Sequence, residues 1–339
     1  MKVAIRPKSS PHNRYVELFA AAFEQAGWEV ATLNWRIAPV LAGRLMILHW
    51  PDDFYASPDL RSRLLSWARI ALMTTSRRLF GVRWIWVVHN LIPHDRKAGD
   101  PKLWRAFTNE LDGLVFLSRE SRQTFAADHP EHCNLPHLVT RHGDYRTGAL
   151  TPPAPWRRPE GTTRLQFVGQ IRPYKNLERL VEAARHLDVE TELGVAGFAA
   201  DGFGTELRRR GAAAAALHFD LRSAPLDEIE FERIVDSSHA AILPYRQILN
   251  SGSALFALSR NRPVIAPALG GLSELRDAVG GQWVYLYDGE LTGAVLRDAA
   301  AWVRTAERPS VCRLDAYDWG VIGPELVRFS ERLIAGARA

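Results

Sequence analysis

The chain has 339 residues, of which 47% are hydrophobic and 24% charged, so it exceeds the usual size of one domain and can build sizeable cores. Its formal net charge of +5 is unevenly distributed, because residues 1–150 carry 20 Lys and Arg against 14 Asp and Glu. The two cysteines, Cys133 and Cys312, lie far apart, which excludes a disulfide framework and a cysteine metal site and predicts a reducing cytoplasm.

The first residues, MKVAIRPKSS, have the pattern of a strand followed by a loop rather than that of a secretory signal. No uninterrupted apolar run in the sequence is long enough to span a bilayer. We therefore expect a soluble or peripheral protein.

Short apolar runs and helical patterns alternate through the first half of the chain. Strands are predicted at residues 3–5, 29–33, 45–49, 84–89 and 113–117. Helices are predicted at residues 15–26, 61–83 and 102–111. This alternation indicates a mostly parallel sheet.

The predicted helix at residues 61–83 is rich in arginine and apolar side chains. It contains six arginines, including Arg61 and Arg83, and no acidic residue. Two interpretations are open: it can lie in an anionic lipid interface, or it can pack one face on its own sheet and leave its arginines in water. Nucleic acid is disfavoured as a partner, because the segment lacks an aromatic platform and a known DNA-binding motif.

A second set of alternating elements follows a break at residues 151–161, TPPAPWRRPEG, which predict an extended linker. Strands are predicted at residues 165–168, 192–196, 217–220, 240–244 and 263–266. Helices are predicted at residues 177–185, 203–210, 226–237 and 254–259.

The predicted fold is therefore α/β, with two Rossmann-like domains whose parallel sheets face a cleft. The N-terminal domain covers residues 1–150 and the C-terminal domain covers residues 162–316. Residues 317–339 are expected to be helical after Gly323 and to pack back on the N-terminal domain.

A possible phosphate-binding turn precedes the helix predicted at residues 254–259. Asn250, Ser251, Gly252 and Ser253 lie where the first N–H groups of a helix have no partner inside it, so a diphosphate can accept hydrogen bonds from them. By itself, such a turn is more often a helix cap.

Two cations follow another predicted strand and favour the phosphate interpretation. This strand ends at Gly169, and Arg172 and Lys175 lie in the loop beyond it, at the sheet edge where parallel sheets collect ligands. Together with the turn, they would neutralise a nucleotide diphosphate and stabilise it as a leaving group. We include Tyr245 in this predicted donor site.

Seven motifs, in matching order over nearly the whole chain, resemble one family. They are HWPD at residues 49–52, HNLIPHD at 89–95, RHGDY at 141–145, GQIRPYKN at 169–176, LPYRQILNSGSALFALSRNRPVIAP at 243–267, WVYLYDGE at 283–290 and YDWGVIG at 317–323. The chain resembles the xanthan- and acetan-type GDP-mannose:glycolipid β-1,4-mannosyltransferases. These are GT-B glycosyltransferases that transfer mannose to a lipid-diphosphate-linked oligosaccharide with inversion.

The resemblance implies a donor site in the second domain, an acceptor site in the first, and no metal or other cofactor besides the nucleotide-sugar co-substrate, GDP-mannose. The sequence lacks a DxD dipeptide in a suitable loop, and Arg172 with Lys175 would replace the charge of a metal ion. The paired glutamates of retaining GT-B enzymes are absent, since Ile248 and Phe256 occupy their places. The ribose contacts are therefore unassigned.

Inverting transfer needs one base that takes the proton of the acceptor hydroxyl. Asp52 and Asp95 follow predicted strands of the first domain, and Asp144 lies in the RHGDY motif. We favour Asp95, with His94 or His89 orienting the substrate or the diphosphate. Such aspartates commonly cap helices or turns instead.

The acceptor site is predicted from two groups of polar residues. Ser9, Ser10 and Asn13 lie in the loop after the first strand, and His49 and His142 follow strand ends or belong to the family motifs. Helix capping explains the first group nearly as well, and each histidine taken singly can be structural.

Two alternatives to the inverting enzyme are a retaining GT-B hexosyltransferase and a non-catalytic protein that binds nucleotide-sugars or polyanions. The expected location is the cytoplasm, peripheral to the inner face of the plasma membrane, where the enzyme would serve polysaccharide biosynthesis.

Overall fold

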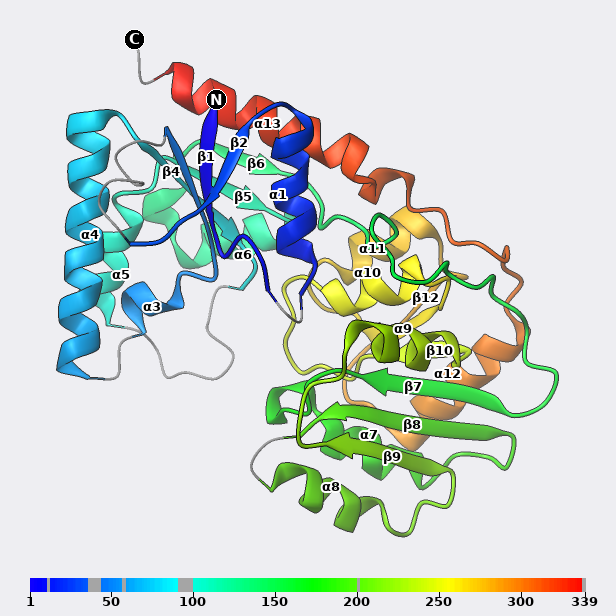
Figure 1. Ribbon diagram of the computed structural model, residues 1–339. Coiled ribbons are helices and arrows are strands. Elements are labelled where there is room, and N and C mark those ends of the chain that lie inside the picture. The colour runs from blue at the N-terminus through cyan, green and yellow to red at the C-terminus, as the bar shows by residue number, and fades with distance from the viewer. Residues whose placement is uncertain (11–12, 36–43, 57–58, 91–99, 200–201, 337–339) are drawn as a thin grey trace. The chain divides into compact units, whose positions relative to one another are not determined.

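The computed structural model describes residues 1–10, 13–35, 44–56, 59–90, 100–199 and 202–336. These form two compact units (Figure 1): unit 1 comprises Met1–Gly143 and Ala316–Ala339, and unit 2 comprises Asp144–Asp315. Each unit is built around its own six-stranded parallel sheet. The predicted α/β class with two Rossmann-like domains is therefore confirmed.

The sheet of unit 1 has the strand order β2-β1-β3-β4-β5-β6. The strands are β1 Lys2–Arg6, β2 Glu29–Thr32, β3 Leu45–His49, β4 Arg83–Val88, β5 Gly113–Phe116 and β6 His137–Val139. The helices are α1 Tyr15–Gln25, α3 Asp52–Tyr55, α4 Leu60–Phe80, α5 Pro101–Thr108, α6 Arg119–Asp128 and α13 Trp319–Ala335. Since β1 pairs with β2 on one side and β3 on the other, the carboxyl ends of β1 and β3 flank a topological switch point, where such sheets bind ligands.

The sheet of unit 2 has the order β12-β11-β10-β7-β8-β9. The strands are β7 Thr163–Val168, β8 Thr191–Phe198, β9 Leu217–Arg222, β10 Ala240–Ile242, β11 Val264–Pro267 and β12 Val284–Tyr287. The helices are α7 Leu177–Ala184, α8 Phe203–Gly211, α9 Glu228–Asp236, α10 Gly252–Ser259, α11 Leu272–Val279 and α12 Gly293–Thr305. Here the switch point lies between β7 and β10.

Every strand predicted from the sequence is present, and the two that were not predicted, β6 and β12, lie at sheet edges. β6 has only three residues, with the exposed His137 at its start, so it lacks the apolar run that marks a buried strand. Helices α6, α11 and α12 were also not predicted. In α6 only Ser121 and Phe125 are buried, and such a polar helix has little apolar periodicity.

The C-terminal helix α13 begins earlier than predicted. It starts at Trp319 rather than after Gly323, because the carboxylate of Asp318 accepts the N–H of Gly320 and caps the first turn. Pro324 lies in the second turn. The helix packs on α1 of the same unit.

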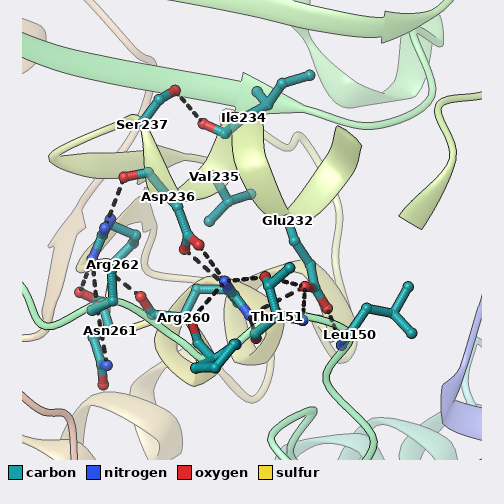
Figure 2. Close-up of polar contacts among 12 residues, drawn as sticks. Leu150, Thr151, Glu232, Ile234, Val235, Asp236, Ser237, Arg260, Asn261 and Arg262 are labelled. Carbon is teal, nitrogen blue, oxygen red and sulfur yellow. Dashed lines mark hydrogen bonds and ion pairs between the residues drawn. The ribbon is translucent and has the colours of Figure 1, made fainter. Parts of the chain in front are cut away.

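The segment predicted as a linker begins with residues that are fixed to unit 2 (Figure 2). The Thr151 N–H donates to the Glu232 carboxylate at 2.9 Å, and the Thr151 carbonyl accepts a hydrogen bond from the Arg260 side chain at 2.6 Å. Farther along, the Trp156 indole donates to the His239 carbonyl at 3.0 Å. The segment has no regular secondary structure, yet buried polar contacts hold it in place.

None of the described helices combines the length and the apolar character that crossing a bilayer requires.

Candidate active site

The predicted phosphate-binding turn lies at the start of α10, after β10. Ser251 is the N-cap residue, and its hydroxyl accepts the N–H of Ala254 at 3.0 Å. The N–H groups of Gly252 and Ser253 come first in the helix and have no acceptor inside it. The Asn250 side-chain amide is buried and its nitrogen has no hydrogen-bond partner, so an unsatisfied donor lies beside these groups.

Lys175 is a buried cation without a carboxylate partner in the described part of unit 2. It ends a short 3₁₀ turn, Pro173–Lys175, that follows β7. Its Nζ lies over the rings of Phe167, Tyr174 and Tyr245, at 5.4, 6.0 and 5.5 Å from their centroids. Burial lowers the pKa of the Lys175 ammonium, and a buried charge of this kind is costly unless an anion joins it.

Tyr245 connects this cation to the turn. Its ring contacts Lys175, and its hydroxyl is hydrogen-bonded to Ser253. Burial raises the pKa of Tyr245 to about 12, so the hydroxyl stays protonated at neutral pH. The loops after β7 and β10 therefore meet at the switch point, as predicted from the two motifs.

The backbone conformation at position 169 favours glycine. Gly169 has φ 141°, and a Cβ atom there would lie 3.3 Å from the Lys175 Nζ. Arg172, in the same loop, is half-buried and makes no ion pair with another described residue.

Sequence reasoning missed a further cation, Arg246. Its Nε donates to the Asn176 side-chain oxygen at 2.8 Å, and this bond joins the loop after β10 to the loop after β7. Asn176 has φ 59°, a conformation that asparagine tolerates better than most residues. The position of Arg246 next to Tyr245 in the LPYRQ motif was the available signal.

Phe256, which occupies the place of the second of the paired glutamates, is part of the core of unit 2. Phe256 packs against a cluster of buried residues that includes Val168 and Val235. Its ring also lies against the rings of Tyr145 and Phe231, at 5.4 and 4.9 Å between centroids. An apolar side chain in this position cannot donate or accept a hydrogen bond.

In unit 1, three predicted histidines lie together around one tyrosine. His49 ends β3, His89 follows β4, and His142 lies in the segment after β6. The ring centroid of Tyr15, the first residue of α1, is 5.9, 5.2 and 4.1 Å from those of His49, His89 and His142. Tyr15 was not predicted as a site residue.

The three histidines are buried and neutral at neutral pH. Burial lowers the pKa of His49 to about 3 and that of His142 to about 4, and it lowers the pKa of His89 well below the usual value. His49 and His89 share a hydrogen bond between ring nitrogens, and the Nδ1–H of His142 donates to the Gly143 carbonyl. The Nε2 atom of His49 has no partner.

Trp50 follows His49 in an unusual backbone conformation. It has φ 46°, which is rare for a bulky residue, and its ring stacks on His89 at 4.6 Å between centroids. Strained residues of this kind concentrate at functional sites.

The described candidate bases have different surroundings. Asp52 begins α3 and accepts the Tyr55 hydroxyl at 3.0 Å. Asp144 is buried and accepts the backbone N–H of Arg146 at 3.2 Å, which is the turn role that aspartate often has. Asp95 and His94 lie outside the described residues.

Asp53, next to Asp52, was not predicted and is held by two arginines. It forms ion pairs with Arg6 at 2.9 Å and Arg69 at 2.7 Å. These contacts fix α3 against β1 and α4.

Asn13 makes two hydrogen bonds to described residues on either side of it in the predicted acceptor segment. The side-chain oxygen of Asn13 accepts a hydrogen bond from the Tyr15 N–H at 3.1 Å. The backbone N–H of Asn13 donates to the Ser10 carbonyl at 3.2 Å. Ser9 is exposed and Ser10 half-buried. Asn13 thus contacts the first residue of α1, although the N-cap residue is Arg14 and has no side-chain cap.

The described residues contain no group of three or more His, Cys, Asp or Glu side chains that could hold a metal ion.

No protein-family model matches the chain. A GDP-mannose:glycolipid 4-beta-D-mannosyltransferase from Xanthomonas campestris pv. campestris is 31% identical over 283 residues, which cover 81% of this chain and 76% of that protein. A second protein of this name from Xanthomonas campestris pv. campestris is 31% identical over 281 residues, with the same coverage.

Solved structures show the same architecture at low sequence identity. The sucrose-phosphate synthase of Thermosynechococcus elongatus superposes with a TM-score of 0.67 at 14% identity and covers 99% of both chains. HepE of Anabaena, in complex with UDP, has a TM-score of 0.66 at 11% identity and covers 98% of this chain and 99% of its own. These similarities establish the GT-B fold.

Proposed function

The chain belongs to the family of the GDP-mannose:glycolipid 4-beta-D-mannosyltransferases and is a glycosyltransferase of the GT-B fold, and we propose that it transfers mannose from GDP-mannose to a lipid-linked glycan with inversion. The observation that carries this proposal is the buried, unpaired ammonium of Lys175 beside the start of α10. The choice of mannose and of a glycolipid is supported by the names of the relatives. The acceptor we propose is a polyprenyl-diphosphate-linked oligosaccharide used in polysaccharide biosynthesis.

The diphosphate of the donor would be bound by unit 2. Lys175 and Arg172 would supply positive charge, and the N–H groups of Gly252 and Ser253 with the Asn250 amide would donate hydrogen bonds. These groups do not need to reorganise as the leaving diphosphate gains charge, so they stabilise the transition state. In this proposal they replace a metal ion.

The reaction is a single displacement. The acceptor hydroxyl oxygen bonds to the anomeric carbon, the bond from that carbon to the diphosphate oxygen breaks, and GDP leaves with the electron pair. A carboxylate side chain takes the hydroxyl proton. We keep Asp95 as the favoured base over Asp52 and Asp144, with His94 or His89 orienting the substrate.

The proposed acceptor places the enzyme at a membrane. We propose that it works on the cytoplasmic side, peripheral to the inner face of the plasma membrane, since a polyprenyl-linked substrate is anchored there.

Binding and transfer are tested in detergent solution. Thermal shift with GDP, UDP and dTDP should give the largest stabilisation with GDP. Lys175→Met should strongly reduce this stabilisation, whereas the control Lys102→Met, which changes an exposed lysine of α5, should not. Transfer from GDP-mannose should survive chelators and give the inverted anomer, whereas a retained anomer would overturn the mechanism. Activity that persists in each of Asp52→Asn, Asp95→Asn and Asp144→Asn would eliminate all three candidate bases.

A further inference from the structure

Helix α4, Leu60–Phe80, buries only a narrow stripe and exposes most of its large apolar side chains, unlike an ordinary surface helix. The residues buried against the rest of unit 1 are Ser66, Ile70, Met73 and Ser76. The large apolar residues that remain exposed are Leu60, Leu64, Leu65, Trp67, Leu79 and Phe80, with exposed fractions from 44% to 74%. Figure 1 shows α4 along one side of unit 1, where it packs on α3, α5 and β4.

The inward face is fixed by polar contacts. The Ser66 hydroxyl donates to the Asp53 carbonyl at 3.0 Å, and the Ser76 hydroxyl accepts the Trp84 indole N–H at 3.1 Å. Arg69 is paired with Asp53, and Arg77 is paired with Asp112 at 2.9 Å. These interactions set the rotation of α4, so the helix cannot turn its leucines inward without breaking them.

The outward face combines apolar side chains with free positive charge. Leu60, Leu64 and Trp67 follow the i, i+4, i+7 spacing of one stripe, and Arg78 continues that stripe in the last turn. Arg61 lies in the first turn, and the side chains of Arg61 and Arg78 make no ion pair with any residue that the structure describes. Arginines at both ends of an apolar face can extend along it and place their charges at its edge.

We infer that the outward face of α4 docks on an anionic lipid bilayer, with the helix lying in the plane of the headgroups. The apolar side chains enter the acyl boundary, and Arg61 and Arg78 bind lipid phosphates. A helix of 21 residues is about 30 Å long and would lie flat over this surface. A second copy of the chain fits poorly, because residues 60–83 contain no acidic side chain to face these arginines.

This inference deepens the proposed function, since a lipid-linked acceptor requires the enzyme to reach a membrane, but its test uses neither donor nor acceptor. The full chain is sedimented with vesicles of phosphatidylcholine alone or with about a third phosphatidylglycerol. We expect at least about tenfold stronger binding to the anionic vesicles, and weaker binding in high salt.

Two double variants separate the contributions of apolar and charged side chains to vesicle binding. Leu64→Ser/Trp67→Ser and Arg61→Gln/Arg78→Gln should each weaken binding to anionic vesicles by about tenfold or more. The matched controls are Ile229→Ser, exposed on α9, and Arg157→Gln/Arg158→Gln, exposed in unit 2, which should bind like the unchanged protein. All substituted side chains are exposed, so the melting temperatures should stay the same.

Three results would overturn the inference: no binding to anionic vesicles, α4 variants that bind as well as the controls, or a lipid-free dimer that the α4 variants convert to monomer. Transfer activity in detergent is measured on the same variants. Full transfer activity without vesicle binding would contradict the docking surface and support the proposed function. Vesicle binding without transfer activity would support the docking surface and contradict the proposed function.

Discussion

The Nδ1 atom of His49 lies 2.9 Å from the Nε2 atom of His89, so the ends of β3 and β4 are joined by one imidazole-imidazole hydrogen bond. Because the other nitrogen of His49 is buried without a partner, the less costly arrangement leaves a lone pair there rather than an N–H. His49 then donates to His89, and the remaining nitrogen of His89, Nδ1, carries a proton. In the proposed function, this N–H of His89 would be the donor that orients the substrate.

This arrangement predicts that His49 is a positioning residue. His49→Phe should lower kcat/KM by about tenfold, because His89 loses the donor that fixes its tautomer. His49→Asn keeps a donor near the position of Nδ1 and should recover most of the loss. Steady-state kinetics of both variants tests this, and equal activity of the Phe and Asn variants would show that His49 only fills space.

The buried histidines also predict how stability depends on pH. Above pH 6.5 they are neutral in both the folded and the unfolded chain. As the pH falls from 6.5 towards 4, the unfolded chain takes up protons that the folded His49 and His142 do not, so stability is lost. By pH 5 the loss should be about 2 kcal/mol for each histidine.

Thermal unfolding between pH 7.5 and pH 5 measures this loss. His142→Asn keeps the donor to the Gly143 carbonyl and should give a shallower fall of the melting temperature with acidity. The control His218→Asn changes an exposed histidine of β9 and should leave the slope unchanged. Identical slopes in all three proteins would contradict the proposed origin of the pH dependence.

The sequence was sufficient to predict the strands that are buried on both faces, because these strands consist of uninterrupted apolar residues. It also placed Lys175 and the Ser251 turn after predicted strands, although β7, which precedes Lys175, contains the exposed Arg164 and the half-buried Gln166. The sequence could not predict the register between neighbouring strands. In this register His49 of β3 lies opposite Val87 of β4, so His89 lies two residues beyond the position opposite His49. The contact between these histidines and the rotation of α4 depend on tertiary packing, which no local pattern encodes.

Lys175 should lower the stability of the free protein and raise its affinity for GDP. Lys175→Met removes a buried, unpaired charge, so the melting temperature without nucleotide should stay the same or rise. The affinity for GDP should fall by about 10- to 100-fold, because a charge-assisted contact to phosphate is lost. Isothermal titration calorimetry and thermal unfolding of the same variant decide this, and a destabilised variant with normal affinity would make Lys175 a structural residue.

The buried ion pair between Arg260 and Glu232 should hold unit 2 together (Figure 2). The two side chains are each about 2% exposed and approach to 3.3 Å, and Glu232 also accepts the N–H groups of Leu150 and Thr151. Arg260→Met leaves Glu232 buried without its cation and should cost about 3–5 kcal/mol.

A double variant and a surface control complete this experiment. Arg260→Met/Glu232→Gln should recover part of the stability, because Glu232 no longer leaves a buried charge without its cation, while Asp236 loses its ion pair with Arg260 in both variants. Arg313→Met, which breaks an exposed pair with Asp315, should have no measurable effect. If the double variant were as unstable as Arg260→Met, the loss would come from packing rather than from charge.

The turn before α10 allows capping and ligand binding to be measured separately. Ser251→Ala removes the hydrogen bond to the Ala254 N–H and should destabilise the protein by about 1 kcal/mol with little effect on GDP affinity. Asn250→Asp has nearly the same shape but replaces an unpartnered donor with a negative charge, so it should weaken GDP binding by more than about tenfold. Asn250→Leu, which removes the donor without adding charge, should weaken binding less. Calorimetric titration of the three variants measures these affinities. If the turn were only a helix cap, all three variants would bind GDP like the unchanged protein.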